Sequence, residues 1–482
     1  MKLSQIFDNV NINGMLPDGE VEHVCADTRQ ITPDSIFFCL KGFVRDGHDF
    51  AAQAIERGAK FVVAERDMGL GERQIVTDDT HKSYALCCAN IFGNPQRKLK
   101  MVGVTGTNGK TTVSHLIRDI LRRSGYRVGL IGTISTDING MVFPAKYTTP
   151  DPLTFYSVLS QMVEAGCEYA VMEVSSHGLD QKRVAGCRFE VGVFTNLTQD
   201  HLDYHGDMEH YFAAKKSLFP LCEKAVVNYD DSYGRLLLQG CGCDDVKSFS
   251  IKFDEANYTA REIVMKASGT SFIFVGDNLI SRVKFPVPGE FSASNAMAAI
   301  SACLQLGLPL ETVAANISNS RGVPGRFEVL DTNTPYTVIR DYAHTPDGIE
   351  KMLSAIRAIT DKKVTILFGC AGNRDRKKRR LMSEAASAAD FIILTSDNPR
   401  REDVMQIIDD ARPGLPEDEN RYIIIPDRYQ AIKWALQHCK EGEVLLLAGK
   451  GHEDYQVLSH ATVHFDEREV VAELLSEMTE EK

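Results

Sequence analysis

The feature that most constrains this chain is a glycine-rich loop between an apolar segment and a helical pattern. The apolar segment ends at Val104, the loop reads TGTNGKTT over residues 105–112, and the helical pattern begins at Val113. Glycines in such a loop let several backbone N–H groups point at phosphate oxygens, Lys110 adds positive charge, and Thr111 offers a hydroxyl to Mg²⁺. We therefore expect a strand, a phosphate-binding loop and a helix, and with them a nucleoside triphosphate site.

The loop departs from the strict phosphate-loop pattern at one position. The pattern G-x-x-x-x-G-K-[ST] requires glycine at the position of Val104, whereas the first glycine here is Gly103. A solvated Gly-Lys turn is the alternative interpretation. The phosphate-binding interpretation is favoured because all other phosphate-binding groups fall in one turn. The predicted contacts are Gly106, Thr107, Asn108, Gly109, Lys110, Thr111 and Thr112.

The chain is long enough for several domains, and its connections predict three. At roughly 100–200 residues per domain, 482 residues correspond to two to four. A proline-marked, charged connection at residues 94–98 and a second connection near residues 331–335 give predicted domains at 1–98, 99–331 and 332–482. We expect an α/β fold throughout: a small N-terminal α/β domain, a central mostly parallel sheet with the phosphate loop, and a C-terminal Rossmann-like domain.

Composition excludes several classes of function. The net charge of −12 argues against nucleic acid or an anionic membrane as the main partner. No signal peptide or apolar run of membrane-spanning length is evident, which favours a cytoplasmic protein. The twelve cysteines contain no Cys-x-x-Cys pair and are interpreted as reduced thiols rather than zinc ligands.

In the predicted central domain, polar residues end or follow apolar strands. Thr148 and Thr149 come after the strand at 128–131, Glu173 ends the strand that begins at Tyr169, and His201 lies shortly after the strand at 191–196. Parallel strands present their carboxyl ends at one sheet edge, so these residues are expected to share a crevice. A carboxylate on a buried strand is costly unless paired or bound to metal, although Glu173 could also be a satisfied core residue.

Two further patterns extend this picture. Helical spacing over residues 206–219 places Lys215 inward and Lys216 outward. In the last third of the chain, apolar strands open into polar segments at residues 342–346, 369–375, 396–400 and 449–453. We therefore expect a second α/β sheet with its own binding edge and without a phosphate loop.

Four motifs together resemble those of the Mur ligase family. They are GVTGTNGKTT at 103–112, YAHTP at 342–346, DNPR at 397–400 and GKGHE at 449–453. The resemblance covers the whole chain, including DTR at 27–29 and DGH at 46–48. It implies one domain for the UDP end of a substrate, one for ATP and one for an incoming amino acid. The DNPR form resembles that of members whose amino acid is meso-diaminopimelate.

The resemblance implies an ATP-dependent amide ligation in peptidoglycan precursor synthesis. Meso-2,6-diaminopimelate would be joined to UDP-N-acetylmuramoyl-L-alanyl-D-glutamate through an acyl phosphate, by a protein expected to be a monomer. Catalytic roles are implied for Lys110, Glu173, His201, Lys215 and His344. ATP would also contact Asn295, Arg326 and Asp341. Mg²⁺ would be held by Thr111, Glu173, His201 and Lys215, the last carbamylated by CO₂.

The resemblance also implies residues for the other two substrates. The UDP-linked dipeptide would contact Thr28, Thr148, Thr149, Ser176, Gln181 and Arg183. Diaminopimelate would contact Arg374, Asp397, Asn398, Arg400, Gly449 and Glu453. The planar fork of Arg400 can meet the extra carboxylate of diaminopimelate, whereas the alternative is a solvated arginine in an Asn-Pro turn.

Other functions remain open from the sequence. One alternative is another ligase of the same superfamily, adding L-lysine or D-alanyl-D-alanine or extending folylpolyglutamate. A second is a nucleotide-gated binding protein without catalysis, which the presence of Lys110, Glu173, His201 and Lys215 argues against.

Overall fold

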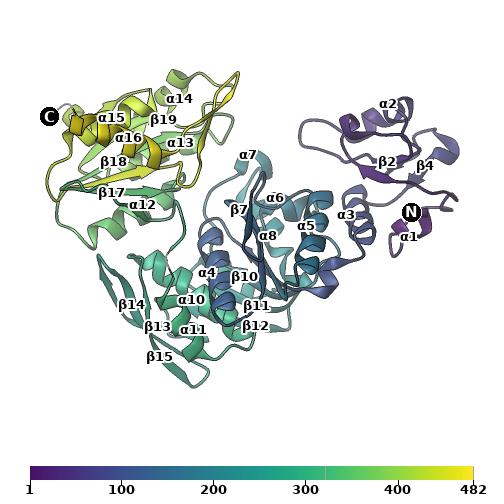
Figure 1. The fold of residues 1–482 in the computed structure, drawn as a ribbon, viewed down its shortest axis with the longest axis horizontal. Coiled ribbons are helices and arrows are strands. Elements are labelled where there is room, and N and C mark those ends of the chain that lie inside the picture. Colours follow the sequence, from purple (N-terminus) through teal and green to yellow (C-terminus); the bar gives the residue numbers. More distant parts are fainter. Residues whose placement is uncertain (321, 481–482) are drawn as a thin grey trace.

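The computed structural model describes residues 1–320 and 322–480, in which three separate sheets carry most of the strands. The N-terminal sheet is parallel, in the order β1-β2-β3-β4. Its strands are β1 (His23–Cys25), β2 (Ser35–Phe38), β3 (Phe61–Ala64) and β4 (Gln74–Val76). Its helices are α1 (Leu3–Ile6), α2 (Ala51–Glu56) and α3 (Thr80–Ile91). Figure 1 shows this unit at one end of the molecule, with α3 next to the central unit.

The central sheet has eleven strands in the described part of the chain, in the order β15-β14-β13-β12-β11-β10-β5-β9-β6-β7-β8. Its middle is parallel, and antiparallel hairpins extend it at both ends. The middle strands are β5 (Lys100–Thr105), β6 (Val128–Ile131), β9 (Tyr169–Glu173), β10 (Phe189–Phe194), β11 (Cys222–Asn228) and β12 (Asp245–Ser250). The outer strands are β7 (Ser135–Ile138), β8 (Met141–Pro144), β13 (Tyr258–Lys266), β14 (Gly269–Gly276) and β15 (Leu279–Phe285).

Helices cover both faces of the central sheet, as the alternation of patterns predicts. The hydrophobic core that contains Val113 and Ile117 of α4 also contains Ala296 and Ile300 of α10, whereas Leu159 of α5 belongs to a second core. The helices are α4 (Lys110–Arg123), α5 (Pro152–Glu164), α6 (Ser176–Asp180), α7 (Leu202–His205), α8 (Met208–Lys216), α9 (Ser232–Leu238), α10 (Glu290–Gln305) and α11 (Leu310–Ser318). The apolar side chains of α4 recur at helical spacing, which explains why this helix lies flat on the sheet.

The C-terminal sheet has the order β16-β17-β21-β18-β19-β20, in which only the β16–β17 pair is antiparallel. Its strands are β16 (Glu328–Leu330), β17 (Thr337–Asp341), β18 (Val364–Cys370), β19 (Phe391–Ser396), β20 (Tyr422–Ile424) and β21 (Val444–Ala448). Its helices are α12 (Pro346–Arg357), α13 (Lys377–Ala386), α14 (Val404–Ala411), α15 (Arg428–His438) and α16 (Glu467–Glu480). A small hairpin joins β22 (Tyr455–Val457) to β23 (Thr462–His464).

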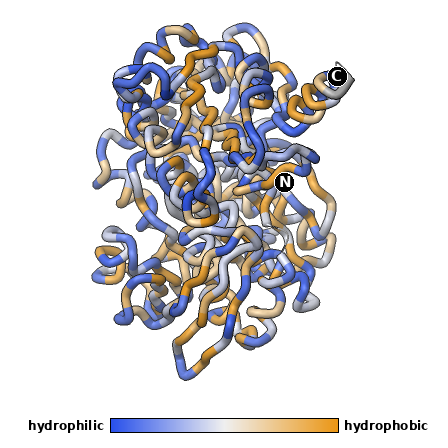
Figure 2. Tube along the Cα trace, turned by 90° about the vertical axis from the view of Figure 1, so that its left-hand side faces the viewer, coloured by the Kyte–Doolittle hydropathy of each residue, from blue (hydrophilic) through white to orange (hydrophobic). Residues whose placement is uncertain are grey.

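These three units confirm the predicted α/β architecture. β16 precedes the predicted boundary at residue 331 and yet pairs with β17; the exact domain limits stay a prediction. Figure 2 shows short hydrophobic segments interspersed with hydrophilic ones along the chain. None of the described helices is both long enough and apolar enough to cross a membrane.

The segment that leads into the C-terminal sheet is in backbone contact with the loop after β21, at Gly325 and Gly451. Gly325 and Gly451 have φ angles of 68° and 50°, in the left-handed region that favours glycine. A Cβ added to Gly325 would lie 2.2 Å from the backbone nitrogen of His452, and one added to Gly451 would lie 2.6 Å from Cβ of Tyr342. Neither position has room for a side chain, so the two segments are in direct backbone contact.

Candidate active site

The phosphate loop between β5 and α4 is shaped by two close approaches. A Cβ on Gly106, whose φ is 147°, would lie 1.9 Å from Oγ1 of Thr195. A Cβ on Gly109, whose φ is 87°, would lie 2.5 Å from Oδ1 of Asn295. The loop therefore requires glycine at both positions, and this requirement explains the spacing in the sequence.

The end of β10 holds the same loop by hydrogen bonds. The backbone N–H of Thr107 donates to the carbonyl of Asn196 at 2.8 Å, and that of Asn108 donates to Oδ1 of Asn196 at 2.9 Å. The hydroxyl of Thr195 donates to the carbonyl of Asn108 at 2.6 Å. The loop is thus held in shape by protein groups alone, which lowers the cost of ordering it around a ligand.

The side chain of Lys110, the first residue of α4, folds back onto the phosphate loop. Its ammonium donates to the carbonyls of Gly106 and Thr107, both at 2.8 Å. Burial lowers the pKa of Lys110, while the nearby carboxylates of Glu173 and Asp200 act in the opposite direction. The amine is held at the mouth of the loop, where it can transfer from carbonyl oxygens to phosphate oxygens.

Glu173 lies fully buried at the end of β9. Its Oε2 accepts hydrogen bonds from the hydroxyls of Thr111 at 3.0 Å and Thr133 at 2.8 Å, and its Oε1 accepts from the N–H of Thr133 at 2.8 Å. These bonds satisfy the carboxylate, as expected of a core residue, but Glu173 and Thr111 also line a cavity. A carboxylate and a hydroxyl beside a phosphate loop are the hard oxygen ligands that Mg²⁺ prefers, so the donor set fits this ion.

A cavity of about 250 Å³ joins the edges of the central and C-terminal sheets. From the central unit it is lined by Thr107, Asn108, Gly109, Lys110, Thr111, Thr133, Thr148, Glu173, Asp200 and His201. From the linker and the C-terminal unit it is lined by Arg326, Tyr342, His344, Gly369, Ala371, Arg374, Lys378, Met382, Asp397, Asn398, Arg400, Gly449 and Glu453. The structure therefore brings most of the predicted nucleotide, metal and amino-acid residues to one space, whereas Lys215, predicted as a metal ligand, is not part of its lining.

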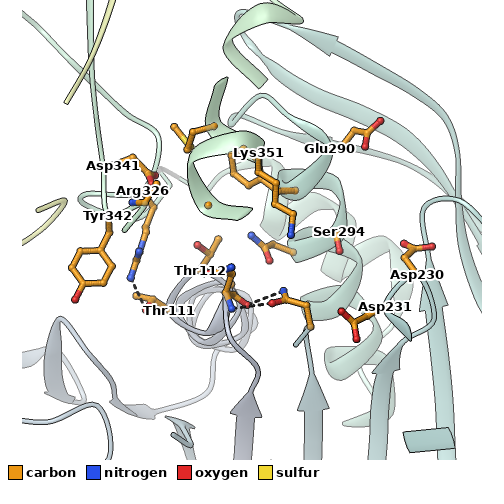
Figure 3. A pocket seen from close by; sticks show the side chains of 18 of the residues that line it. Thr111, Thr112, Asp230, Asp231, Glu290, Ser294, Arg326, Asp341, Tyr342 and Lys351 are labelled. Atoms are coloured by element: carbon orange, nitrogen blue, oxygen red, sulfur yellow. Dashed lines mark hydrogen bonds between the residues drawn. The ribbon is translucent and has the colours of Figure 1, made fainter. Parts of the chain in front are cut away.

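A second cavity, of about 280 Å³, continues from the phosphate loop on the side of α10 (Figure 3). Predicted ATP contacts line it: Asn108, Gly109, Thr111, Thr112, Asn295, Arg326 and Asp341. Figure 3 shows Arg326 reaching toward Thr111, whose hydroxyl accepts from Nη2 at 3.1 Å. Ile251, Phe291 and Met352 add apolar surface to the lining, of the kind on which a nucleobase can pack.

A buried ion pair links the two sheets beside the first cavity. Oδ1 of Asp200 lies 3.3 Å from Nζ of Lys378, and its Oδ2 lies 3.5 Å from Nε2 of His201 and 3.8 Å from Nε2 of His344. Burial alone would raise the pKa of Asp200, but Lys378 and the two histidines outweigh it and hold this pKa well below the usual range. Burial lowers the pKa of His201 to about 3 and that of His344 to about 4.

Sequence analysis missed both partners of this ion pair. Asp200 stands in a polar segment after β10, in which the histidine drew attention instead. Lys378 is the second residue of α13, in the basic run KKRR at 377–380, where an inward lysine cannot be told from solvated ones. The signal that could have identified Lys378 is its position four residues before Met382, on the same side of α13.

Lys215 lies inward on α8, as its helical position predicts, with 1% of its surface exposed. Its ammonium donates to the carbonyl of Gly106 at 2.8 Å and lies 4.5 Å from the ring centroid of Tyr211. Burial holds the pKa of Lys215 well below its usual value, and the charge of Lys110 acts in the same direction. Lys215 does not itself line the cavity among the described residues; it contacts the phosphate loop from behind.

Five of the six residues predicted for the UDP-linked substrate gather near the end of β9. The hydroxyl of Thr149 donates to the carbonyl of Glu173 at 2.9 Å, and Arg183 donates to the carbonyl of Thr149 at 2.6 Å. Arg183 also donates to Oε1 of Gln181 at 2.7 Å. The remaining near contacts are Thr148 Oγ1 with Thr133 Oγ1 at 3.1 Å and Ser176 Oγ with His205 Nε2 at 2.9 Å.

Thr28 is the sixth and stands elsewhere. It lies in the short 3₁₀ helix Thr28–Gln30 of the N-terminal unit, where its carbonyl accepts from Nη1 of Arg57 at 3.1 Å. The two units share a hydrophobic core that contains Tyr84 and Phe155, and Phe43 also contacts Tyr204, with ring centroids 5.5 Å apart. A ligand that contacted Thr28 and the other five residues together would have to extend across both units.

The predicted amino-acid residues form the C-terminal wall of the first cavity. Burial and the neighbouring Arg374 lower the pKa of the Arg400 guanidinium, and its buried Nε has no hydrogen-bond partner among the described residues. Nδ2 of Asn398 donates to Oε2 of Glu453 at 2.8 Å. Burial and the charge of Asp397 raise the pKa of Glu453. Two arginines and a carboxylate therefore face one cavity, which suits a ligand that carries both a carboxylate and an ammonium group.

Comparison with known proteins gives matches along the whole chain. Family models match residues 20–88 (Mur ligase family, catalytic domain), 104–303 (Mur ligase middle domain) and 325–451 (Mur ligase, glutamate ligase domain). A UDP-N-acetylmuramoyl-L-alanyl-D-glutamate--2,6-diaminopimelate ligase of Geobacillus thermodenitrificans is 42% identical over 461 residues, 94% of each chain. Ligase 1 of that name from Clostridium acetobutylicum is 40% identical over 485 residues, 99% of this chain and 100% of that one.

Solved structures agree with these relatives. A structure titled UDP-N-acetylmuramoyl-L-alanyl-D-glutamate--2,6-diaminopimelate ligase superposes with a TM-score of 0.69 at 30% identity and covers 99% of each chain. MurF from Acinetobacter baumannii superposes with a TM-score of 0.64 at 19% identity over 95% of this chain and 94% of that one, a likeness of fold alone.

Proposed function

The chain belongs to the Mur ligase family and is an ATP-dependent ligase, and from that premise we propose that it joins meso-2,6-diaminopimelate to UDP-N-acetylmuramoyl-L-alanyl-D-glutamate in peptidoglycan precursor synthesis. The observation that carries the proposal is the 250 Å³ cavity, in which the phosphate loop faces Arg400 and Glu453. Phosphoryl transfer and amino-acid capture can occur in one space because both sets of groups line it.

The chemistry requires activation, since an amine does not displace oxide from a carboxylate. The substrate carboxylate attacks the γ-phosphorus of ATP, the bond from that phosphorus to the β,γ-bridging oxygen breaks, and ADP leaves with an acyl phosphate formed. The deprotonated amine then attacks the acyl carbon, a tetrahedral intermediate collapses, and phosphate leaves with the amide formed. Lys110 neutralises charge on the transferred group, and the preformed loop fixes its position.

We assign Mg²⁺ binding to Thr111 and Glu173, with His201 beside them. The supporting observation is the pair of hard oxygens on the cavity wall, 3.0 Å apart. When bound, the ion supplies positive charge to the phosphate oxygens. Mg²⁺ keeps water and phosphate ligands, so few protein groups are required.

We also propose that Lys215 works as a carbamate. A carbamate forms when a neutral amine attacks CO₂ and loses a proton, and burial lowers the pKa of Lys215, which favours the neutral amine. The change would place an anion behind the phosphate loop, which would offset the charge of Lys110 and attract Mg²⁺. The carbonyl of Gly106 accepts from both Lys215 and Lys110, so it would keep the Lys110 donor if the Lys215 side chain shifted on modification.

The division of labour among the domains follows the three predicted segments. Residues 1–98 would hold the UDP end of the substrate through Thr28, residues 99–331 would hold ATP, and residues 332–482 would hold the amino acid. Nδ2 of Asn108 donates to Oδ2 of Asp347 at 2.8 Å, a second contact between the central and C-terminal units beside the Asp200–Lys378 pair. Catalysis requires both units to be apposed, because each supplies one wall of the cavity.

A product-mass measurement tests the proposal. The protein is incubated with ATP, Mg²⁺ and the UDP-muramoyl dipeptide, and meso-diaminopimelate and L-lysine compete at equal concentration. We expect ADP release and a product that contains diaminopimelate. Product mainly with lysine would assign the chain to the lysine-adding type. Activity on the UDP-muramoyl tripeptide with D-alanyl-D-alanine, or on folate, would assign it to another ligase, and ATP binding without any amide product would assign it to a binding protein.

We further propose that the protein acts as a cytoplasmic monomer, because ATP and UDP-linked precursors are made in the cytoplasm and one chain supplies every wall of the cavity. Light scattering of the purified protein checks the monomer, with a mass near 53.5 kDa expected.

A further inference from the structure

We propose that Lys450 is a positioning residue for the amino-acid substrate: its buried ammonium fixes Asn398 and Glu453 in the arrangement that receives one ammonium group of a diamino acid. The proposal rests on the proposed function and assigns a role to a residue that lies outside the cavity wall. Lys450 follows β21, and its side chain is fully buried.

Lys450 lies behind residues of the cavity wall rather than among them. Its neighbours Gly449 and Glu453 line the 250 Å³ cavity, as does Asn398, but Lys450 does not. Its Nζ lies 3.3 Å from Oε2 of Glu453 and 3.4 Å from Oδ1 of Asn398. A buried ammonium is costly unless its partners compensate for lost water, and these two side chains are the hydrogen-bond acceptors it meets.

The first consequence concerns the amide of Asn398. Its Oδ1 accepts from the backbone N–H of Val457 at 2.9 Å as well as from Lys450. A flipped amide would place its NH₂ group against both of these donors. The amide is therefore held with Nδ2 toward Glu453, to which it donates at 2.8 Å.

The second consequence concerns the two oxygens of Glu453. Oε2 receives the hydrogen bonds of Lys450 and Asn398. Oε1 has a weaker contact, the hydroxyl of Tyr342 at 3.5 Å. Because one oxygen is saturated by protein donors, the other is left as the acceptor for an incoming ammonium group.

The third consequence concerns charge. Burial and Asp397 raise the pKa of Glu453, whereas Lys450 and Asn398 lower it. Tyr342, Tyr455 and Arg400 also interact electrostatically with this carboxyl. Without Lys450, the carboxyls of Glu453 and Asp397 would have less positive charge beside them. The pKa of Glu453 would then be higher, so this carboxyl would take up a proton at a higher pH. A protonated Glu453 cannot pair with an ammonium group.

Steady-state kinetics of Lys450→Met test the role. We expect the KM for meso-diaminopimelate to rise at least about tenfold, with kcat and the KM values for ATP and the UDP substrate changed less than about threefold. The variant's KM for diaminopimelate should fall more steeply with rising pH than that of the wild type, because Glu453 would lose its proton at a higher pH in the variant. Lys450→Arg should recover part of the affinity. Lys433→Met, a partly exposed lysine paired with Glu477 on the C-terminal unit, serves as the matched control.

A double-mutant cycle with Glu453→Gln separates positioning from an independent role. If Lys450 acts through Glu453, the double variant binds diaminopimelate no worse than Glu453→Gln alone. The proposal would be overturned if the two substitutions raised the KM for diaminopimelate by factors that multiply in the double variant. It would also be overturned if Lys450→Met raised the KM for ATP instead, or if its loss of diaminopimelate affinity did not depend on pH. If Lys450→Met does not fold by circular dichroism, Lys450→Gln and Lys450→Arg are put through the same cycle.

The amino acid that the wild type incorporates distinguishes failure of this proposal from failure of the proposed function. If it incorporates L-lysine rather than diaminopimelate, the proposed function fails, and the cycle is repeated with lysine as substrate. Lys450 then retains its role if the effects on the KM for lysine are non-additive in the same way, and loses it if they multiply.

Discussion

We expect the two walls of the candidate active-site cavity to recognise their ligands by different means. At the nucleotide wall, consecutive residues of one loop supply backbone groups and Lys110, and the end of β10 fixes the loop's shape. At the amino-acid wall, side chains from separate loops after β19 and β21 hold each other in place, and Asn398 and Lys450 are 52 positions apart in the sequence. One wall is a backbone cradle, and the other is a side-chain network.

This difference determines how each wall should respond to substitution. Loss of one side chain at the cradle leaves its backbone geometry intact and removes a charge. Loss of one side chain in the network also frees its partners, because each member saturates another. The following predictions test that contrast, from the largest expected effect to the smallest.

Replacement of Lys110 by alanine should have the largest effect. The change removes the positive charge nearest the outer phosphates, so we expect turnover to fall by about two to three orders of magnitude or more. Binding of the UDP substrate should be unchanged, as isothermal titration can measure. Near-normal turnover would remove the phosphate-loop assignment.

Lys215→Ala tests the carbamate behind the cradle. We expect a nearly inactive protein, by about a hundredfold or more, with partial rescue by short carboxylates that enter the vacated space. The half-buried neighbour Lys216 provides the control, since Lys216→Ala should retain activity. Wild-type turnover in Lys215→Ala would contradict the proposed modification, and mass spectrometry under CO₂ would show whether it forms.

Arg400→Ala tests the amino-acid wall at the arginine that is proposed to bind a carboxylate of diaminopimelate. An unmatched buried group costs about 1–3 kcal/mol, so the preference for meso-diaminopimelate over L-lysine should fall by roughly ten- to hundredfold. Competition between the two amino acids, with products resolved by mass, measures this ratio. Arg401→Ala, on an exposed neighbour, should leave it unchanged.

Lys378→Met tests the ion pair that joins the two walls. Asp200 would remain buried without its ammonium partner, so we expect apposition of the units to weaken and kcat/KM to fall about tenfold for both ATP and the amino acid. Lys377→Met, one residue earlier and exposed, is the control. A change confined to one of the two substrates would assign Lys378 to that wall alone.

The smallest effect concerns acid stability. Burial lowers the pKa of His177 from 6.5 to about 4 and that of His452 from 6.5 to about 3. The unfolded chain therefore binds more protons below about pH 6.5, and the free energy of unfolding should decrease as pH falls from about 6.5 toward 4.

Urea unfolding at several pH values measures this slope. His177→Asn and His452→Asn should each make the slope shallower, by up to about one proton. An unchanged slope in both variants would mean that neither histidine is held neutral.

The contrast between the walls also explains what the sequence could predict. The α/β architecture followed from alternating apolar strands and helical patterns, and the phosphate loop from contiguous residues. The functional assignments of Arg400 and Glu453 rested on resemblance, because no spacing rule connects loops so distant in the chain. Asp200, Lys378 and Lys450 were missed because a buried charge is recognised by its partner, and partners that are distant in the sequence become visible only in three dimensions.

The backbone contact between Gly325 and Gly451 connects the two walls of the cavity in a way that no side chain does. Arg326, one residue after Gly325, donates to the hydroxyl of Thr111 at the phosphate loop, and Lys450 and Glu453 lie close to Gly451 in the sequence. A side chain at Gly325 would clash with the backbone of Gly451 and His452. A single added methyl group would therefore be expected to displace groups at both walls of the cavity at once.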